Sequence, residues 1–265
     1  MNLLLPGMYV AVDSPIHRLD PRVKMGATLL LMALPFAAPA VLSGILLLVF
    51  VASVALLSRA PLPALLRTVR TVFWLGVFMF FFYLFTTPGQ VILATHGITL
   101  TLEGIALGAT QVYRLCLLVV LSSLLTFTTS PAQLTQGLEA LLSPLTHFGL
   151  PVRELSMVLT IALRFVPTLL DQIDSITKAQ QARGARIRTG APWQRVRSWV
   201  PTFVPLFVAA LRRADELARA MDARGFRGTR QRTHLHELNL TRADLAASMA
   251  VVVAAGAILA CQRIA

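Results

Sequence analysis

The chain has 265 residues, of which 56% are hydrophobic and 14% are charged, and its mean hydropathy is +0.70. Soluble domains carry about 25% charged residues, so this composition excludes an ordinary soluble protein. A helix crosses a bilayer with about 20 apolar residues. Long stretches free of charge occupy residues 25–58, 71–102, 115–138 and 245–262. The chain is therefore predicted to be an all-α, polytopic helical membrane protein.

The apolar stretches predict five spans, which in chain order are residues 24–35, 41–58, 71–85, 104–128 and 243–262. Pro35 and Pro39 separate the first two spans, because proline removes a backbone donor and clashes with the preceding turn. A loop is expected over residues 86–102. The first two spans are short, which leaves open whether they are tilted, re-entrant or longer than drawn, and leaves the number of spans open by one or two.

The placement of the positive charge predicts the orientation of the chain, since Lys and Arg accumulate on the cytoplasmic side of short loops. Of the 24 basic residues, three precede the first span, three lie between the second and third, and 16 lie in residues 129–242. The loop over 86–102 has none. We therefore predict a multi-pass protein of the cell membrane, inner or plasma, whose N-terminus and basic segment are cytoplasmic, with 22 of the 24 basic residues inside.

The chain divides into three predicted parts, which are transmembrane helices over 1–128, a cytoplasmic module over 129–240 and a C-terminal transmembrane helix over 241–265. A helix is expected to open the module, because Ser130 is a good N-cap and Pro131 suits the first helical position. Two longer helices are predicted over 153–183 and 198–224. Each has an apolar first half and a charged second half, which is typical of a helix that leaves the bilayer boundary.

The two long helices share a pair of short motifs. Phe-Val-Pro occurs at 165–167 and 203–205. Each helix then ends in Ala-Arg-Gly, as Ala182, Arg183 and Gly184 and as Ala223, Arg224 and Gly225. Glycine takes the left-handed position after a helix without steric penalty, and the arginine beside it faces the negative end of the helix dipole. The arginine is also a bidentate donor that can reach a partner's carboxylate or carbonyl. The tips are either a partner-binding pair or ordinary helix ends.

These motifs resemble those of a known family, the T components of energy-coupling factor (ECF) transporters, which are transmembrane coupling proteins. Five stretches carry the resemblance, two of which contain the Ala-Arg-Gly tips, and the quoted letters are those of this chain. They are SPIHRLDPRVK at 14–24, TTSP at 128–131, LRFVP at 163–167, AQQARG at 179–184 and AMDARGF at 220–226. The resemblance extends over residues 14–232, and no motif position departs from the pattern.

The resemblance implies how the chain works. The two long helices would cross as coupling helices, and each tip would dock into one of two ABC-type ATPase subunits through Arg183 or Arg224. The apolar faces would hold a separate substrate-binding S component. ATP-driven closure of the ATPases would reorient the S component for uptake of a vitamin or a metal ion. The chain itself would hydrolyse nothing and would need no cofactor.

Four further residues are structural or coupling candidates. Arg164 belongs to the LRFVP motif. Asp20 and Arg22 flank a proline, and they are expected either to pair with the basic module and brace the first span or to form a solvated turn. Arg114 lies about ten residues into the fourth span, where a charge is costly. It is expected to contact a polar group of the S component or a neighbouring helix, unless the span starts later and the side chain snorkels.

The sequence argues against several other function classes. No metal site is predicted, because residues 234–237 (HLHE) lack the spacing of HExxH and the two cysteines form no CxxC pair. Nucleic-acid binding is disfavoured by the broad apolar faces, which suit the lipid bilayer. An S component would lack the long basic module, and an intramembrane enzyme would show paired aspartates, HExxH or GxSxG within a span. A conventional ABC permease subunit with its own translocation path is the alternative that the sequence separates least.

Overall fold

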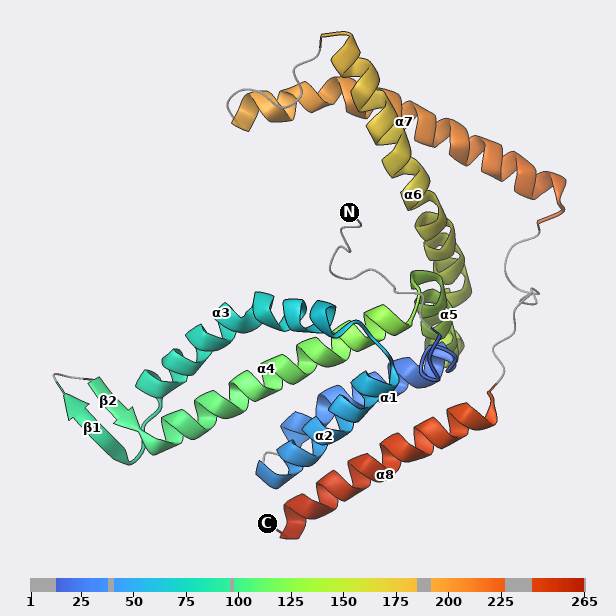
Figure 1. The fold of residues 1–265 in the computed structure, drawn as a ribbon. Coiled ribbons are helices and arrows are strands. Elements are labelled where there is room, and N and C mark those ends of the chain that lie inside the picture. Colours follow the sequence, from blue (N-terminus) through green and yellow to red (C-terminus); the bar gives the residue numbers. More distant parts are fainter. Residues whose placement is uncertain (1–12, 38–40, 96–97, 185–191, 227–239, 265) are drawn as a thin grey trace. The chain divides into compact units, whose positions relative to one another are not determined.

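The computed structural model describes residues 13–37, 41–95, 98–184, 192–226 and 240–264. The chain forms two compact units. The membrane unit consists of Met1–Leu141 and Glu237–Ala265, and the arm unit consists of Leu142–His236. Figure 1 shows the order of the elements along the chain. The boundary at Leu142 lies inside the predicted 129–240 module, so the first helix of that module belongs to the membrane unit.

Within the described residues, the helices of the membrane unit are α1 Pro21–Ala37, α2 Val41–Leu57, α3 Leu62–Thr86, α4 Leu102–Thr128, α5 Pro131–Leu142 and α8 Arg242–Ile264. Each predicted span coincides with one of these helices. By length and hydropathy α3, α4 and α8 can cross a membrane, and α2 is apolar over 17 residues. The third helix begins at Leu62 and not at Thr71, because a search for charge-free stretches misses the turns that carry Arg67 and Arg70.

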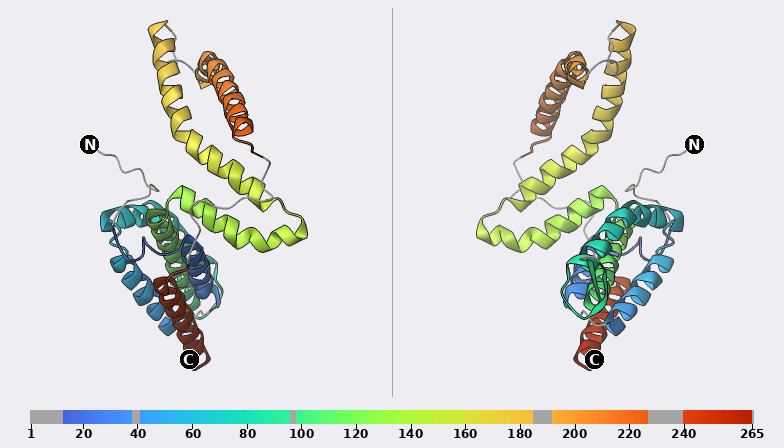
Figure 2. Two further views of the ribbon diagram at one scale, coloured as in Figure 1. Left: turned by 90° about the vertical axis from the view of Figure 1, so that its right-hand side faces the viewer. Right: turned by 90° about the vertical axis from the view of Figure 1, so that its left-hand side faces the viewer.

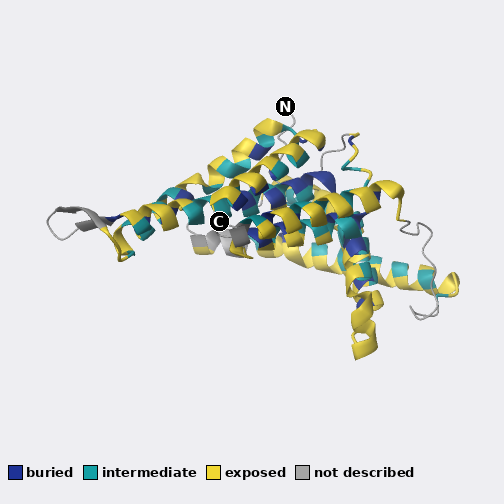
Figure 3. Cartoon of the chain, turned by 90° about the horizontal axis from the view of Figure 1, so that it is seen from below, coloured by how far each residue is buried: buried dark blue, intermediate teal, exposed yellow. Residues whose placement is uncertain are grey.

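The apolar core of the membrane unit lies between α1, α2, α4 and α8. Its buried side chains include Leu31, Leu34, Leu47, Val51, Leu117, Leu121, Leu124, Phe127, Ala255 and Ile258. Helix α3 packs against α4 at small residues: a Cβ added to Gly108 would lie 3.1 Å from the ring of Phe80. Elsewhere exposed residues (yellow) prevail over buried ones (dark blue) in Figure 3. Exposed aromatic side chains such as Trp74 suit a surface that meets lipid chains.

A β-hairpin stands where a loop was expected between the third and fourth spans. Strands β1 Val91–Thr95 and β2 Ile98–Thr101 pair antiparallel. The reason is local composition, since five of these nine residues are Ile or Thr and such β-branched side chains favour strands. The Thr101 hydroxyl then caps α4 by accepting a hydrogen bond of 3.1 Å from the Gly104 amide. The prediction of an all-α protein is confirmed, with this hairpin as an addition in the described part of the chain.

The arm unit contains the 3₁₀ helix η1 Ser143–Phe148 and the long helices α6 Val152–Ala182 and α7 Pro192–Ala223. Helices α6 and α7 cross in Figure 1 and lie against each other in both views of Figure 2. Helix α7 begins at Pro192, earlier than the predicted residue 198, and it continues through two internal prolines. Helix α6 also meets the length and hydropathy of a membrane span, although its second half carries Asp171, Asp174 and Lys178.

One helix end has an unusual backbone. Four described residues have a positive φ, and three of them are glycines that follow helices: Gly149, Gly184 and Gly225. The fourth is Arg59, which follows α2 with φ 51°. A side chain in this left-handed conformation costs roughly 1–2 kcal/mol, because its Cβ approaches the carbonyl oxygen. Arginine therefore occupies a position where glycine is the less costly residue.

Candidate docking tips and coupling residues

The two Ala-Arg-Gly motifs form matching helix ends. At the end of α6, the Gly184 amide donates to the Gln181 carbonyl at 2.9 Å, and Gly184 has φ 87°. At the end of α7, the Gly225 amide donates to the Asp222 carbonyl at 2.9 Å. The Phe226 amide then donates to the Met221 carbonyl at 3.0 Å, which completes a Schellman motif. The predicted left-handed glycines are thus confirmed at both tips.

The arginines at these tips are free to meet a partner. Arg183 and Arg224 are both exposed. Neither guanidinium has a hydrogen bond or an ion pair to another described residue of the chain. Each arginine follows the last helical residue, where the unpaired carbonyls carry the negative end of the dipole and stabilise a cation. Each tip therefore presents a fixed backbone turn with one unpaired, planar donor group beside it.

Contacts between α6 and α7 fix the spacing of the tips. Near the end of α6, Gln180 Nε2 donates to the Pro201 carbonyl at 3.2 Å. Further back on α6, the Phe165 ring lies 5.5 Å from the guanidinium carbon of Arg213. The two helices therefore run antiparallel through their contact. Arg224 lies about 34 Å along α7 from Pro201 at the ordinary rise of a helix, so the tips point away from opposite ends of the contact.

Arg164 and its neighbour play different roles. Arg164 is exposed on α6 and has no hydrogen bond or ion pair to the residues that the structure describes. Phe165 beside it makes the cation–π contact with Arg213. Sequence reasoning missed Arg213 and Gln180, because nothing in the spacing of one helix shows which residues the other helix will meet.

Asp20 and Arg22 begin α1. The Asp20 carboxylate accepts a hydrogen bond of 2.8 Å from the Arg22 amide, so Asp20 is the N-cap and Pro21 is the first helical residue. Asp20 is only 7% exposed, which rules out a fully solvated turn. The partner that holds this helix start is Asp244 at the start of α8, whose carboxylate accepts from the Asp20 amide at 2.7 Å. The Arg22 Nε atom is buried and has no partner within the described residues.

Asp244 belongs to a cluster that we call the polar joint, which consists of the buried residues Asp20, Lys24, Thr128 and Asp244 and the exposed Thr241. Lys24 is 5% exposed, and its amine donates to the carbonyls of His17 at 2.9 Å and Thr128 at 3.0 Å. Asp244 is 1% exposed and accepts from the Thr241 amide and hydroxyl at 2.8 and 2.6 Å. The starts of α1 and α8 and the end of α4 therefore meet at one side of the membrane unit. The signal in the sequence that could have predicted this cluster is Asp244 itself, an acidic residue at the start of a predicted span.

Arg114 contacts a neighbouring helix, which was one of the two expectations for it. Its Nε donates to the Pro35 carbonyl at 3.0 Å, and its guanidinium carbon lies 5.2 Å from the centre of the Phe36 ring. The Pro35 carbonyl has no ordinary helical donor, because the residue four positions on is Pro39, which lacks an amide hydrogen. Arg114 therefore donates to a carbonyl near the end of α1 that has no amide donor four positions on.

The described residues contain no cluster of three or more His, Cys, Asp or Glu side chains that could hold a metal ion. Residues 234–237, weighed above as a metal-binding group, lie outside the described part of the chain.

Comparisons with known proteins agree with this architecture. Residues 13–235 match the model of the CbiQ family, which is described as a cobalt transport protein. The energy-coupling factor transporter transmembrane protein EcfT of Acidaminococcus fermentans is 44% identical over 90% of this chain and 89% of that protein. The proteins of the same name from Thermosediminibacter oceani and Heliobacterium modesticaldum are 44% and 45% identical, over 98% and 92% of both chains respectively. The multi-pass helical chain with its twin arginine tips therefore belongs to the CbiQ family and is a relative of the EcfT transmembrane proteins.

Proposed function

We propose that this chain is the coupling subunit of an ECF-type importer, in which α6 and α7 transmit ATP-driven motion from two ATPase subunits to a substrate-binding S component. The observation that carries the proposal is the pair of exposed arginines, Arg183 and Arg224, on two matching helix ends. A single such end would be an ordinary C-cap. Two that share the same three-residue motif indicate two equivalent partners.

The geometry of the arm unit supports two separate docking events. The tips point away from opposite ends of the α6–α7 contact, so one compact partner would not reach both. Each guanidinium can form two parallel hydrogen bonds to a carboxylate or to carbonyl oxygens in a groove. A pair of homologous ATPase subunits offers two such grooves. Movement of one groove relative to the other would then turn α6 against α7.

The S component is proposed to bind the apolar faces. Helix α7 exposes large apolar side chains that recur at helical spacing, namely Val200, Phe203, Val204, Phe207, Val208 and Leu211. Such a stripe on a long helix requires cover by lipid or by another apolar protein surface. We propose that the solute, a vitamin or a metal ion, is bound by that S component and not by this chain. On this proposal the chain is non-catalytic, and its N-terminus and arm face the cytoplasm.

The decisive experiment is affinity capture of the tagged full chain from detergent-solubilised native membranes, with mass spectrometry of the proteins recovered. The wild-type chain is expected to recover two ABC-type ATPase subunits and at least one small membrane protein. The double variant Arg183→Glu/Arg224→Glu should lose the ATPases by about a hundredfold, because charge reversal replaces the attraction at both contacts with repulsion. It should still insert into the membrane and retain the S component, since the apolar faces are unchanged.

Arg219→Glu provides the control, because Arg219 is exposed on α7 about one turn before the tip and undergoes the same charge reversal as each tip arginine. It should capture the ATPases as well as the wild type does. Full ATPase recovery by the double variant would contradict the proposal. It would show that the tips are ordinary helix ends without a docking role. Recovery of ATPases without any small membrane protein would favour a permease with its own translocation path.

A further inference from the structure

Two neighbouring hollows open in the membrane unit. The first, which we call the apolar groove, is a cavity of about 250 Å³ whose lining comes from α1, α2, α4 and α8 and includes Ala27, Phe50, Leu121 and Ala250. The second, the arginine hollow, has about 340 Å³ and is lined by Asp13, Ser14, Pro15, Arg18 and Arg59.

The two hollows share the same short segments of chain. In the segment before α1, Arg18 lines the arginine hollow while its neighbour Leu19 lines the apolar groove. After α2, Ser58 lines the groove and Arg59 lines the hollow. These segments lie where α1 begins and α2 ends, the level at which Lys24 bonds to the end of α4. Helix ends of a membrane protein lie near the headgroups, so the hollow is at headgroup depth and the groove extends among the spans.

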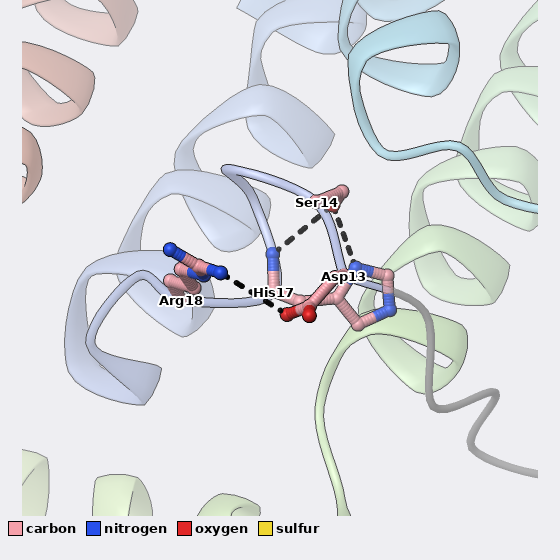
Figure 4. A network of polar contacts seen from close by, with 4 residues as sticks. All are labelled: Asp13, Ser14, His17 and Arg18. Atoms are coloured by element: carbon pink, nitrogen blue, oxygen red, sulfur yellow. Dashed lines mark hydrogen bonds and ion pairs between the residues drawn. The ribbon is translucent and has the colours of Figure 1, made fainter.

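Both arginines of the hollow are available for an anion. Figure 4 shows the turn that carries Arg18, in which the Ser14 hydroxyl bonds to His17 Nδ1 at 2.7 Å. Arg18 meets Asp13 at 3.4 Å, but the two side chains are 77% and 88% exposed, and such a surface pair contributes little. Arg59 is exposed, and its guanidinium has no hydrogen bond or ion pair to any residue that the structure describes. The hollow therefore holds two cations and one acid.

The backbone of Arg59 points to a use for its side chain. Arg59 adopts the left-handed conformation that glycine takes after three other helices of this chain. Strain of this kind persists where the side chain or the surrounding structure has a reason to keep it, and it gathers at ligand sites. The one strained residue in the described chain thus projects a free guanidinium beside an apolar groove.

We propose that the apolar groove and the arginine hollow together bind one anionic phospholipid, with part of an acyl chain in the groove and its phosphate between Arg18 and Arg59. Planar guanidinium groups are matched to phosphate oxygens, and the groove is lined mostly by apolar side chains that suit an acyl chain. Lys24 also lines the groove, but its amine is already bonded to two carbonyls, so its hydrocarbon stem contributes apolar surface. The site would select anionic over zwitterionic lipids, because the arginines of the hollow attract a headgroup with a net negative charge.

Native mass spectrometry of the purified full chain, titrated with phosphatidylglycerol or phosphatidylcholine in detergent, tests this site. The wild type is expected to retain one phosphatidylglycerol at concentrations where phosphatidylcholine is lost. Arg18→Gln and Arg59→Gly should each weaken phosphatidylglycerol binding about tenfold, since each removes a charge-assisted contact to phosphate. Arg59→Gly relieves the strained backbone, so its loss of lipid would not come from misfolding. Arg67→Gln, an exposed arginine of α3 outside both hollows, is the control and should bind as the wild type does.

A second pair of variants tests the groove. Ala250→Phe places a ring in the groove and should weaken phosphatidylglycerol binding about tenfold. Val252→Phe, which lies about 200° around α8 at nearly the same depth, should leave binding unchanged. Glycerol phosphate at the same concentration should not displace the lipid. Equal retention of both lipids, or equal loss in Arg67→Gln, would overturn the proposal. Displacement by glycerol phosphate with Ala250→Phe unaffected would also overturn it, in favour of a soluble phosphate ligand.

Discussion

At the scale of single residues, the polar joint shows how a membrane protein keeps charges away from water. Lys24 is surrounded by two carbonyl acceptors, and the charges of Asp20 and Asp244 act on its amine. Buried charges are tolerated only when they are paired and hydrogen-bonded. Asp20, Lys24 and Asp244 are all nearly inaccessible. Lys24 is the one cation of the joint, so its loss leaves both acids without a counter-charge.

Replacing Lys24 should therefore be far more damaging than replacing an exposed lysine. We expect Lys24→Met to lower the free energy of unfolding by about 3–5 kcal/mol, because it leaves buried acids without a cation. Thermal or denaturant unfolding in detergent would measure this change. The control is Lys178→Met, which breaks a 2.9 Å bridge to Asp174 between side chains that are 73% and 70% exposed. Its expected effect on unfolding is close to none, because water screens an ion pair between such exposed side chains.

The double variant Lys24→Met/Asp244→Asn sharpens this test. It removes one positive and one negative charge. The side-chain oxygen at position 244 can still accept the hydrogen bond from the backbone amide of Asp20. Its cost should be smaller than the sum of the two single costs. An additive result would show that the charges do not interact, and would contradict the account of the joint.

At the scale of elements, local signals in the sequence predicted helix starts and ends well. Ser130 and Gln133 form a reciprocal capping box at α5, with bonds of 3.0 and 3.3 Å, as the choice of Ser130 for the N-cap anticipated. The left-handed glycines at both tips were predicted for the same reason. By contrast, the starts of α3 and α7 lay several residues earlier than predicted. Charged side chains and prolines in those turns resemble loop residues until packing is known.

The docking of α5 on α1 depends on one glycine. A Cβ at Gly137 would lie 3.0 Å from Met25 Sδ and 3.2 Å from Pro21 Cβ. We expect Gly137→Ala to destabilise the membrane unit by about 1–3 kcal/mol, since part of the contact lies against the rigid start of α1. The control is Gly26→Ala within α1, where nothing lies within 4 Å of the added carbon. That change should stabilise the chain by about 0.5–1 kcal/mol through helix propensity, and unfolding midpoints in detergent would compare the two.

At the scale of the whole molecule, composition predicted the class, a multi-pass helical membrane protein, because long apolar helices follow from the thickness of the bilayer itself. The polar joint was out of reach, since its hydrogen bond from Asp20 to Asp244 spans 224 positions of sequence. The twin tips were found because a motif was repeated. Arg213 and Gln180 were missed because their partners lie on another helix.

The predicted orientation is testable by labelling single cysteines in intact cells with a membrane-impermeant thiol reagent, after Cys116 and Cys261 are replaced by alanine. Gln90→Cys beside the hairpin should react from outside, because the segment over 86–102 has no basic residue to hold it in the cytoplasm. Ser175→Cys in the charged half of α6 should react only after the cells are permeabilised. Reaction of Ser175→Cys in intact cells would show that α6 crosses the bilayer, as its length and hydropathy permit.

The polar joint also sets an order of events during biosynthesis. The bond from Lys24 to Thr128 closes across 104 residues, whereas the bond from Asp20 to Asp244 closes across 224. At the usual 5–20 residues per second, the ribosome needs roughly 10 to 45 s after making Asp20 before Asp244 exists. During that interval the nascent chain holds a lysine that lacks one of its two acids, and an apolar bundle without α8. A chain that terminates early would remain in this state, with a buried cation short of one acid and an apolar surface that α8 would otherwise cover.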